Sequence, residues 1–528
     1  MTLVTQGKAT MNRWATILAA TAALATGAAQ AQPAGTIPTA RVKVETGELV
    51  GLARENANVF RDIPYAAPPV GPLRWKPPRP AAAWQGERQA ILAGPSCPQP
   101  MRADGTPNEG GANGPTSEDC LQLNVFAPKN ARHAPVMVWI HGGSHRRGAG
   151  WIYDGSNFAR DGVVLVAINY RLGALGWFAH PTLTKDAGAE PVANYGLMDQ
   201  IAALKWVQRN IAAFGGDPKN VTVFGESAGG MSTLALLATP AAKGLYAKAI
   251  VESGAGWFKP TTLAQEEAKG AAALAKLGAP ATATAKELRA LPVEQLVGLD
   301  ANYGPVTDGK LMTETPSQAL ADGRFADVPL IIGSNSGEDS LLGPGPIPAE
   351  RLTPFLTPAV RAVYAEEAAK GGDQLVARAL FTDWLMGGPA RWVAARAAAG
   401  QPSWLYYFSY IGDRFRPAKT RASHADEIQY VFEYWGRRTP MSVVSDEDKR
   451  MATLMHACWV AFAKTGAPKC GSEAWPAYDP AKDQLMEFGA SSGVRAHLRK
   501  AQLDAQEKAA LPTLALGAPA QTKNAATN

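Results

Sequence analysis

The sequence predicts an α/β protein, in which helices cover a mostly parallel central sheet. Six short runs are continuously apolar and rich in β-branched residues, as expected of strands that are covered on both faces. Segments with helical character separate these runs, and a repeated strand–helix–strand order favours parallel strands with helical crossovers. The predicted strands are 135–143, 162–173, 220–227, 247–254, 328–335 and 403–411.

The segments between the strands predict helices and two insertions. Residues 199–215, DQIAALKWVQRNIAAFG, carry apolar residues at helical spacing. Two alanine-rich blocks, about 258–325 and 340–400, interrupt the alternation and are predicted to be helical insertions over one end of the sheet. We expect a single large domain over 32–511 and a flexible tail over 512–528, which is small and polar.

The first 31 residues have the pattern of a cleaved signal peptide. Lys8 and Arg13 are their only charged residues, an apolar run begins near Trp14, and Ala29-Gln30-Ala31 fits an A-x-A cleavage pattern. An uncleaved membrane anchor is the alternative, but the apolar run is short for a bilayer, which needs roughly 20 residues. We therefore expect export to the periplasm or the medium. No later stretch is long and apolar enough to span a membrane.

The charge of the chain gives no indication of a nucleic-acid partner. Removing residues 1–31 takes away two positive charges and no negative ones, which lowers the net charge from +6 to +4. This is mild for a chain of 528 residues, and no basic run contains interleaved aromatic residues.

The four cysteines are compatible with an oxidising compartment. Cys97 and Cys120 enclose a stretch rich in Gly, Pro and Asn, and a bridge there would stabilise the fold by about 3 kcal/mol. Cys458 and Cys470 could form a second bridge or remain two separate thiols. A metal site is not expected, because the chain has no C-x-x-C motif and its seven histidines are scattered.

The stretch VTVFGESAGGMST, residues 221–233, indicates a catalytic serine. Gly225-Glu226-Ser227-Ala228-Gly229 fits G-x-S-x-G at a predicted strand-to-helix turn. A sharp turn there holds the serine hydroxyl above the sheet and requires small residues two positions away. The next N–H begins the helix, where a developing oxyanion can accept a hydrogen bond. The alternative is an ordinary glycine turn with a capping serine.

A second motif, VWIHGGSHRRG at 138–148, lies about 80 residues before this serine. A predicted strand ends at His141, and Gly142 and Gly143 would bring backbone N–H groups close to a neighbouring ligand. This is typical of the H-G-G type of oxyanion loop, although a simple turn is the alternative.

With these motifs in place, the chain resembles the type-B carboxylesterases, the α/β-hydrolase family that includes cholinesterases, mammalian carboxylesterases and secreted bacterial esterases. The resemblance covers roughly residues 38–500. It implies an α/β-hydrolase fold with the insertions over the active-site end, and hydrolysis of a small-molecule ester without a metal or organic cofactor. The matching stretches are 117–128, 169–177, 193–230, 328–340 and 424–432.

The same resemblance implies a catalytic triad. Ser227 matches the nucleophile, and His424 matches the base in an H-x-x-E-I segment. Glu338 matches the acid, with the adjacent Asp339 as the alternative. The order Ser227, Glu338, His424 is that of the α/β-hydrolases.

Other site features also follow from the resemblance. The oxyanion donors would be the backbone N–H groups of Gly143, Ser144 and Ala228, with Ser144 standing where the family often has a third glycine. Glu118 and Arg171 match a structural salt bridge of the family, and Cys97 and Cys120 match its N-terminal disulfide. The family's other common disulfides have no counterpart.

Residues near the predicted site bear on the class of ester that it accepts. Glu226, His145 and Arg146 are candidate substrate-binding residues, because they neighbour the predicted nucleophile and oxyanion loop. Basic residues near the pocket would favour an ester that bears a carboxylate, and some secreted bacterial relatives, fumonisin esterases among them, cleave polycarboxylate side-chain esters. The alternative is that these residues are solvated or paired at the surface. The basic residues in question are Arg146, Arg147, Arg414, Arg416, Lys419, Arg421, Arg437 and Arg438.

Three function classes follow from this pattern. The sequence favours a secreted serine carboxylesterase. A hydrolase of the same fold acting on amides, carbamates or lipid esters is the second, and a non-catalytic cholinesterase-like binding protein is the third, although such proteins lack the serine or histidine that this chain keeps. The oligomeric state, monomer or dimer, is not indicated.

Overall fold

The computed structural model describes residues 38–514 and 516, except positions 260, 300, 302, 436–438 and 472–473. The chain divides into the units Met1–Ile37 and Pro38–Asn528. The predicted signal peptide lies outside the described residues, as do Arg437, Arg438 and most of the predicted tail.

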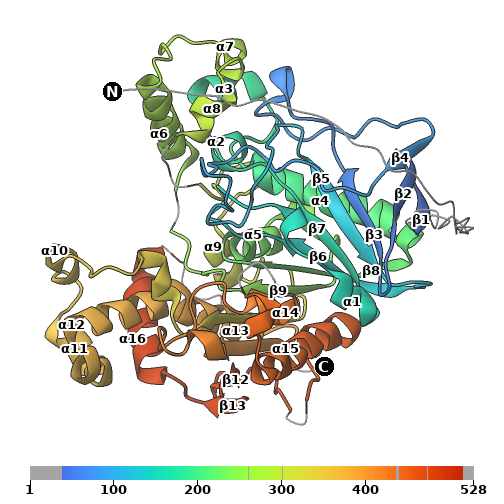
Figure 1. Cartoon of the computed structure of the whole chain (residues 1–528). Helices are drawn as coiled ribbons and strands as arrows, with labels where there is room; N and C mark the ends of the chain where they lie inside the picture. Colours follow the sequence, from blue (N-terminus) through green and yellow to red (C-terminus); the bar gives the residue numbers. More distant parts are fainter. Residues whose placement is uncertain are drawn as a thin grey trace, which may run out of the picture. The chain divides into compact units, whose positions relative to one another are not determined.

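A single sheet runs through the unit Pro38–Asn528, and its described part contains thirteen strands (Figure 1). The strand order is β1-β2-β3-β5-β7-β6-β8-β9-β10-β11-β12-β13, with β4 beside β2. The strands are β1 Thr39–Val44, β2 Gly47–Ala53, β3 Asn58–Pro64, β4 Glu87–Gln89, β5 Gln122–Ala127, β6 Ala134–Ile140, β7 Val164–Ile168, β8 Gly216–Glu226, β9 Lys248–Glu252, β10 Leu330–Asn335, β11 Ser403–Phe408, β12 Gln484–Phe488 and β13 Gly493–Ala496. Each of the six predicted runs overlaps one of the strands β6 to β11, although β6 and β8 begin before their predicted runs.

The central strands are parallel, as predicted. From β7 through β6, β8, β9, β10 and β11 to β12, every neighbouring pair is parallel. The flanking pairs along the strand order, such as β3 with β5 and β12 with β13, are antiparallel, whereas β4 is parallel to β2. Because parallel strands end at one edge, the residues that follow β6, β8 and β10 gather at the same side of the sheet.

Alternate residues of the central strands pack against different helix layers, as the two-residue period requires. On β6, Val136 and Val138 belong to the core cluster that contains α4 (Tyr195–Asn210) and α5 (Ala228–Leu237). Met137 and Trp139 belong to the other cluster, with α1 (Ser156–Arg160) and α15 (Asp446–Thr465). Figure 1 shows α1 and α15 in front of the sheet and α4 and α5 behind it. Coverage of both faces explains why these strands are continuously apolar.

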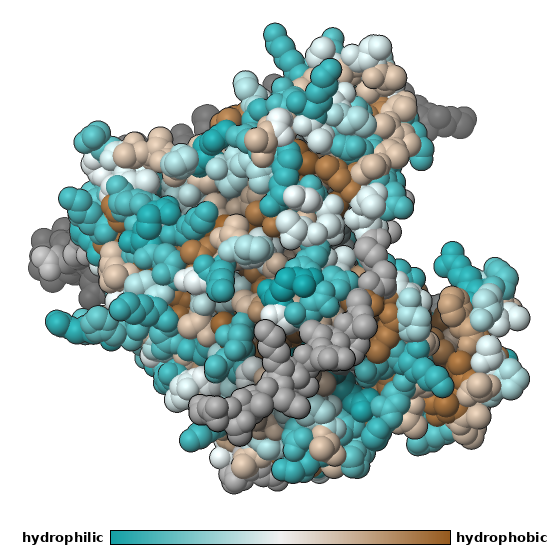
Figure 2. All heavy atoms as spheres, turned by 180° about the vertical axis from the view of Figure 1, so that it is seen from behind, coloured by the Kyte–Doolittle hydropathy of each residue, from teal (hydrophilic) through white to brown (hydrophobic). Residues whose placement is uncertain are grey.

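Both alanine-rich blocks contain helices, and the second is the more helical of the two. The first contains α6 Leu263–Lys276, α7 Ala285–Arg289, α8 Val293–Val297 and α9 Pro316–Ala321, and the second contains α10 Ala349–Leu352, α11 Pro358–Val363, α12 Ala365–Thr382, a π-helical turn Asp383–Gly387 and α13 Gly388–Ala397. The second block exposes large apolar side chains, and hydrophobic areas appear on it at the lower right of Figure 2. These side chains include Phe355 and Trp384.

The remaining α-helices of the described residues are α2 Gly173–Gly176, α3 Pro181–Ala187, α14 Ile428–Val431 and α16 Lys500–Ala510. Among the helices that the structure describes, none combines the length and the apolar character needed to cross a membrane.

Both cysteine pairs are bridged, Cys97 with Cys120 and Cys458 with Cys470. The first bridge confirms the pairing that the family resemblance implied. The second settles the alternative between a bridge and two separate thiols.

The predicted salt bridge between Glu118 and Arg171 is wrong. Glu118 instead binds the guanidinium of Arg74 through both oxygens, at 2.7 and 2.5 Å. Arg171 binds Asp199 on α4, which is fully buried, at 2.8 and 2.7 Å. A buried carboxylate needs a charged partner with several hydrogen bonds, and Arg171 supplies it with its backbone N–H as well as its side chain.

Candidate active site

Ser227 lies at the turn between β8 and α5, in a backbone conformation that is rare for a residue with a side chain. Its φ is 56° and its ψ is −122°, and its N–H donates to the carbonyl of Glu252 at 2.9 Å. A Cβ atom on Gly225 would lie 2.6 Å from the Gly229 carbonyl carbon, and one on Gly229 would collide with the Ile140 carbonyl oxygen. The two glycines of the motif therefore allow β6, β8 and α5 to approach closely enough to hold this turn.

The H-G-G loop packs directly against this serine. A Cβ atom on Gly142 would lie 2.7 Å from Glu226 Oε2 and 3.0 Å from Ser227 Cβ. Gly143, Ser144 and His145 all have positive φ values of 101°, 57° and 52°. The loop thus turns sharply beside Ser227, while Ala228 begins α5, where first-turn N–H groups lack partners within the helix. These positions bring the predicted oxyanion donors of the loop and of Ala228 to the same turn.

His424 and Glu338 are in direct contact. His424 Nδ1 lies 2.5 Å from Glu338 Oε2. His424 Nε2 makes no hydrogen bond with the described residues, and it lies 3.1 Å from Oε1 of Glu226, the neighbour of Ser227. The His424 ring is thus held through Nδ1, while its Nε2 lies beside Glu226, at the turn that carries Ser227.

Glu338 is fixed by several donors, and Asp339 is not part of this contact. Glu338 is fully buried, and its Oε1 accepts from Ser253 Oγ at 2.6 Å and from the Asn335 N–H at 2.7 Å. Asp339 points elsewhere and pairs with Arg378 at 3.1 Å and Arg421 at 2.9 Å. Of the two acids weighed from the sequence, only Glu338 contacts the histidine.

Glu226 belongs to this charge network. It is 3% exposed and lies beside His424 Nε2. Burial by itself would lower the pKa of His424, but the charges of Glu226 and then Glu338 outweigh it and raise this pKa from 6.5 to about 10. The structure thus shows Glu226, predicted as a substrate-binding residue, as the neighbour whose charge raises the pKa of the histidine.

Two further buried carboxyl groups, Glu252 and Glu427, received no role from the sequence, although Glu427 is the glutamate of the H-x-x-E-I segment. Both are fully buried, and Glu252 accepts from Trp459 Nε1 at 2.8 Å while Glu427 accepts from Asn335. Burial raises the pKa of Glu252 to about 8 and raises that of Glu427 well above its usual range. The signal available in the sequence was Glu252 at the end of the apolar run KAIVE. An acidic residue is rarely fully buried in a strand unless it has a partner or a function.

The side chain of His145, a residue of the H-G-G loop, is buried and only 1% exposed. Its Nε2 is 2.9 Å from Ser232 Oγ on α5, its Nδ1 is 3.3 Å from the Tyr303 carbonyl, and its ring lies 4.4 Å from that of Trp177. Burial lowers its pKa to about 4. These contacts join the loop to α5 and to Tyr303, and the substrate-binding role of His145 stays a prediction.

Four of the eight predicted basic residues have acidic partners among the described residues. Arg147 pairs with Glu109 at 3.2 Å, and Arg146 lines a small recess with Leu172 and Leu296. Before the histidine, Arg414 lies over the Phe415 ring, while Arg416, Lys419 and Arg421 pair with Glu447, Asp426 and Asp339. Within the described residues, these contacts agree with the reading of paired surface charges.

One group outside this site has the composition of a metal site. Asp161, Glu433 and His456 could each offer a ligand atom within 4.8 Å of the others. The guanidinium of Arg160 pairs with both carboxylates, at 2.7 and 2.6 Å. A cation of the protein itself thus already occupies the position between these acids.

The parallel sheet, the strained serine turn and the contact of His424 with Glu338 define an α/β-hydrolase. The model of the carboxylesterase family matches residues 38–352 and 347–506, and the chain belongs to this family. The protein is accordingly a carboxylic ester hydrolase.

Individual relatives agree with this assignment. The para-nitrobenzyl esterase of Bacillus subtilis is 38% identical over 466 residues, which cover 83% of this chain and 92% of that protein. The fumonisin B1 esterase of Sphingopyxis macrogoltabida is 36% identical over 482 residues, which cover 85% of this chain and 86% of that protein. The solved structure of a PNB esterase is 35% identical, covers 88% of this chain and 99% of its own, and superposes with a TM-score of 0.75.

Proposed function

We propose that this protein hydrolyses small carboxylic esters through an acyl-enzyme on Ser227, with His424 as the base and Glu338 as the acid that orients it. The observation that carries the proposal is the arrangement of His424. Its Nδ1 is fixed by a buried carboxylate at 2.5 Å, and its Nε2 lies beside the turn that presents Ser227. A nucleophile, a base and an orienting acid at one point are what acyl transfer requires.

In the first half-reaction, Ser227 Oγ attacks the carbonyl carbon of the ester and His424 Nε2 takes its proton. The backbone N–H groups of Gly143, Ser144 and Ala228 donate to the oxyanion that forms. The tetrahedral intermediate then collapses, the bond to the alcohol oxygen breaks, and His424 returns the proton to that oxygen.

In the second half-reaction, water replaces the alcohol. His424 takes a proton from water, the hydroxide attacks the acyl carbon, and the bond to Ser227 Oγ breaks with return of the proton to the serine. Glu338 holds the imidazole in the tautomer that leaves Nε2 able to accept, and it stabilises the imidazolium that forms in each half.

Neutral esters fit the surroundings of this site better than esters that bear carboxylates. Arg147, Arg416, Lys419 and Arg421 are each paired with an acidic side chain, so an anionic substrate would have to displace these partners. The buried Glu226 adds a negative charge beside the histidine. The similarity to a fumonisin B1 esterase is the observation that favours the alternative, a substrate that bears carboxylates.

Hydrolysis of two p-nitrophenyl esters distinguishes a preference for neutral esters from a preference for esters that bear a carboxylate. The kcat/KM of wild type is measured with a butyryl ester and with an ester that carries a free carboxylate at the acyl end. We expect the butyryl ester to be favoured. A tenfold preference for the anionic ester, about 1.4 kcal/mol of transition-state binding, would contradict this part of the proposal.

The serine mechanism has its own test. The Ser227→Ala variant should reduce kcat by more than about 10⁴-fold, and an organophosphate should label wild type at one site and the variant at none. Hydrolysis by the variant at the wild-type rate would show that another group is the nucleophile.

We further propose that the protein is exported and that cleavage follows Ala31. The two disulfides are compatible with an oxidising compartment. Sequencing of the protein recovered from the periplasm or the medium should give Gln32 as the first residue. Recovery of the full chain from the cytoplasm would contradict the proposal.

A further inference from the structure

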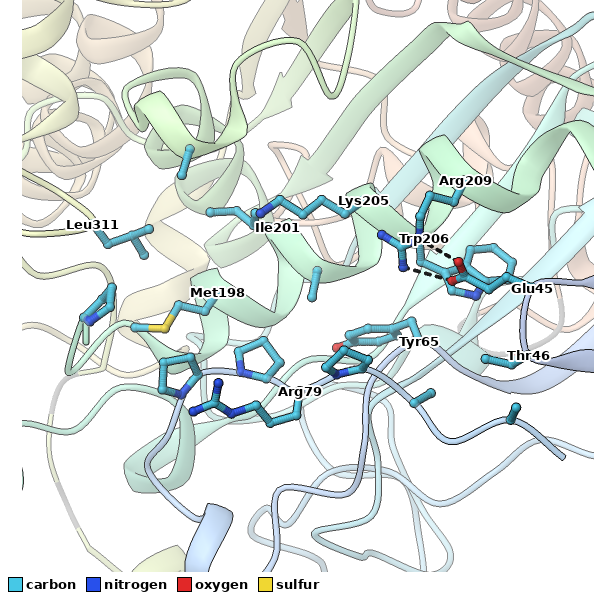
Figure 3. Close-up of a pocket in the computed structure, with 18 residues that line it drawn as sticks. Glu45, Thr46, Tyr65, Arg79, Met198, Ile201, Lys205, Trp206, Arg209 and Leu311 are labelled. Atoms are coloured by element: carbon cyan, nitrogen blue, oxygen red, sulfur yellow. Dashed lines mark hydrogen bonds and ion pairs between the residues drawn. The ribbon is translucent and has the colours of Figure 1, made fainter. Parts of the chain in front are cut away.

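A cavity of about 670 Å³ lies outside the candidate active site, on the outer side of α4 (Figure 3). This volume is in the range of small-molecule sites. None of its lining residues belongs to the serine turn, the oxyanion loop or the His424 segment. Its walls are α4 on one side and a proline-rich segment, residues 77–83, on the other.

Most of the lining is apolar and rigid. Met198, Ile201 and Trp206 come from α4, and Tyr65 and Leu311 come from other parts of the chain. Four prolines add ring surfaces with little conformational freedom, so a flat apolar group can be buried here at a small entropic cost. They are Pro77, Pro78, Pro80 and Pro191.

The charges of the lining favour an anion. Arg79, Lys205 and Arg209 are cationic, and Glu45 is the one acid in the lining. Arg209 holds Glu45 through both oxygens, at 2.8 and 2.9 Å, and lowers its pKa. This pair is drawn at one end of the cavity in Figure 3.

Lys205 differs from the two arginines in its ion pairing. Arg79 pairs with Glu190 at 2.6 Å, whereas Lys205 has no carboxylate within ion-pair distance in the part of the chain that the structure describes. Figure 3 shows Lys205 on the same wall as Ile201. Lys205 is exposed, so its ammonium is hydrated and is available to a carboxylate that enters the cavity.

Two buried polar atoms of the lining also lack partners. Trp206 is 1% exposed and Thr46 is 8% exposed, and neither Trp206 Nε1 nor Thr46 Oγ1 makes a hydrogen bond with the described residues. Atoms this deeply buried are out of reach of a ligand in the cavity, so they do not define its chemistry. The apolar walls and the ammonium of Lys205 specify the ligand class.

We propose that this cavity is a second binding site, which takes a small carboxylate with a flat apolar body. The body packs between α4 and the proline-rich segment, and the carboxylate pairs with Lys205. The site is independent of the proposed serine mechanism, because no residue of that mechanism lines it.

Calorimetric titration with 2-naphthoate tests the proposal, with 2-naphthamide as the neutral comparison. We expect 2-naphthoate to bind with a Kd at least tenfold lower than that of the amide. Lys205→Gln should raise the Kd of 2-naphthoate at least tenfold, and Ala202→Phe, which fills the cavity, should abolish binding. Lys219→Gln is the matched control, since Lys219 is an exposed lysine outside the cavity, and it should leave the Kd unchanged.

Retained hydrolysis of a p-nitrophenyl ester shows that Lys205→Gln and Ala202→Phe are folded. An unchanged Kd in these two variants would place 2-naphthoate elsewhere and overturn the proposal. Equal binding of the amide and the carboxylate, or no binding of 2-naphthoate to wild type, would overturn it as well.

Discussion

At the scale of single residues, Glu226 has the strongest effect on the charge of the proposed base. It lies 3.1 Å from His424 Nε2, and its charge is the largest contribution that raises the pKa of that histidine. A base must be neutral to accept the serine proton. Because the pKa of His424 is raised to about 10, the fraction of neutral imidazole falls as the pH falls below that value. Activity should therefore decrease with decreasing pH.

The Glu226→Gln variant should therefore shift the acidic limb of the kcat/KM profile to lower pH. Loss of an adjacent opposite charge lowers the pKa of an imidazole by about 1 to 3 units. The profile of free enzyme is measured with a neutral ester, and Glu48→Gln, at an exposed glutamate of β2, is the control. A limb that stays in place or moves to higher pH would contradict the role of Glu226.

Glu338 and Asp339 offer a matched pair of variants. Glu338→Gln should lower kcat by about 10⁴-fold, since a glutamine at this position selects the wrong tautomer of His424. Asp339→Asn breaks ion pairs with Arg378 and Arg421 and should lower the Tm while most of kcat remains. Measurement of both quantities for both variants separates the acid from its neighbour, and the reverse pattern would make Asp339 the acid.

At the scale of elements, the proposed oxyanion loop is supported by α5. His145 joins the loop to Ser232, which also accepts from Gln200 on α4 at 3.0 Å. The carbonyl of His145 accepts the Gly173 N–H at 2.7 Å. The donors of the loop are thus held by contacts made one residue away from them.

We expect His145→Ala to lower kcat about 10- to 100-fold with a small change in KM, because the donors act mainly on the transition state. The affinity for a trifluoromethyl ketone should fall by the same factor, which a change in stability alone would not cause. His133→Ala, at an exposed histidine, serves as the control. A change in KM alone would indicate that His145 touches the substrate.

The accuracy of the sequence-based prediction differs between elements for physical reasons. The six strands and the G-x-S-x-G turn were predictable, because buried parallel strands are apolar throughout and a sharp turn needs glycine locally. The actual partner of Glu118, Arg74, was not predictable, since the choice among nearby guanidinium groups depends on how separate segments pack. The positions of Glu252 and Glu427, and the anchoring role of His145, likewise depend on contacts between residues far apart in the chain.

At the scale of the whole molecule, the two disulfides should differ in their effects. Each closes a loop, with sequence separations of 23 and 12, and each should contribute about 3 kcal/mol to the free energy of unfolding. The first loop also reaches the active site, because Gln99 exchanges two hydrogen bonds with the backbone of Gly148, both at 2.8 Å.

Replacement of Cys97 and Cys120 by serine should therefore lower both the Tm and kcat. Replacement of Cys458 and Cys470 should lower the Tm alone. Thermal unfolding and ester hydrolysis of the two double variants make the comparison. Equal losses of kcat would show that the first loop does not support the oxyanion loop.

Asp339 connects three segments that are distant in the sequence. Its carboxylate binds Arg378 of α12 and Arg421 of the segment before His424, and its backbone N–H donates to Thr382 Oγ1 at 3.1 Å. Segments that share such contacts open cooperatively. In amide hydrogen exchange, the end of α12 and residues 421–424 should lose protection together. The local stability of the second alanine-rich block would then determine how often the proposed base, His424, is displaced from Glu338.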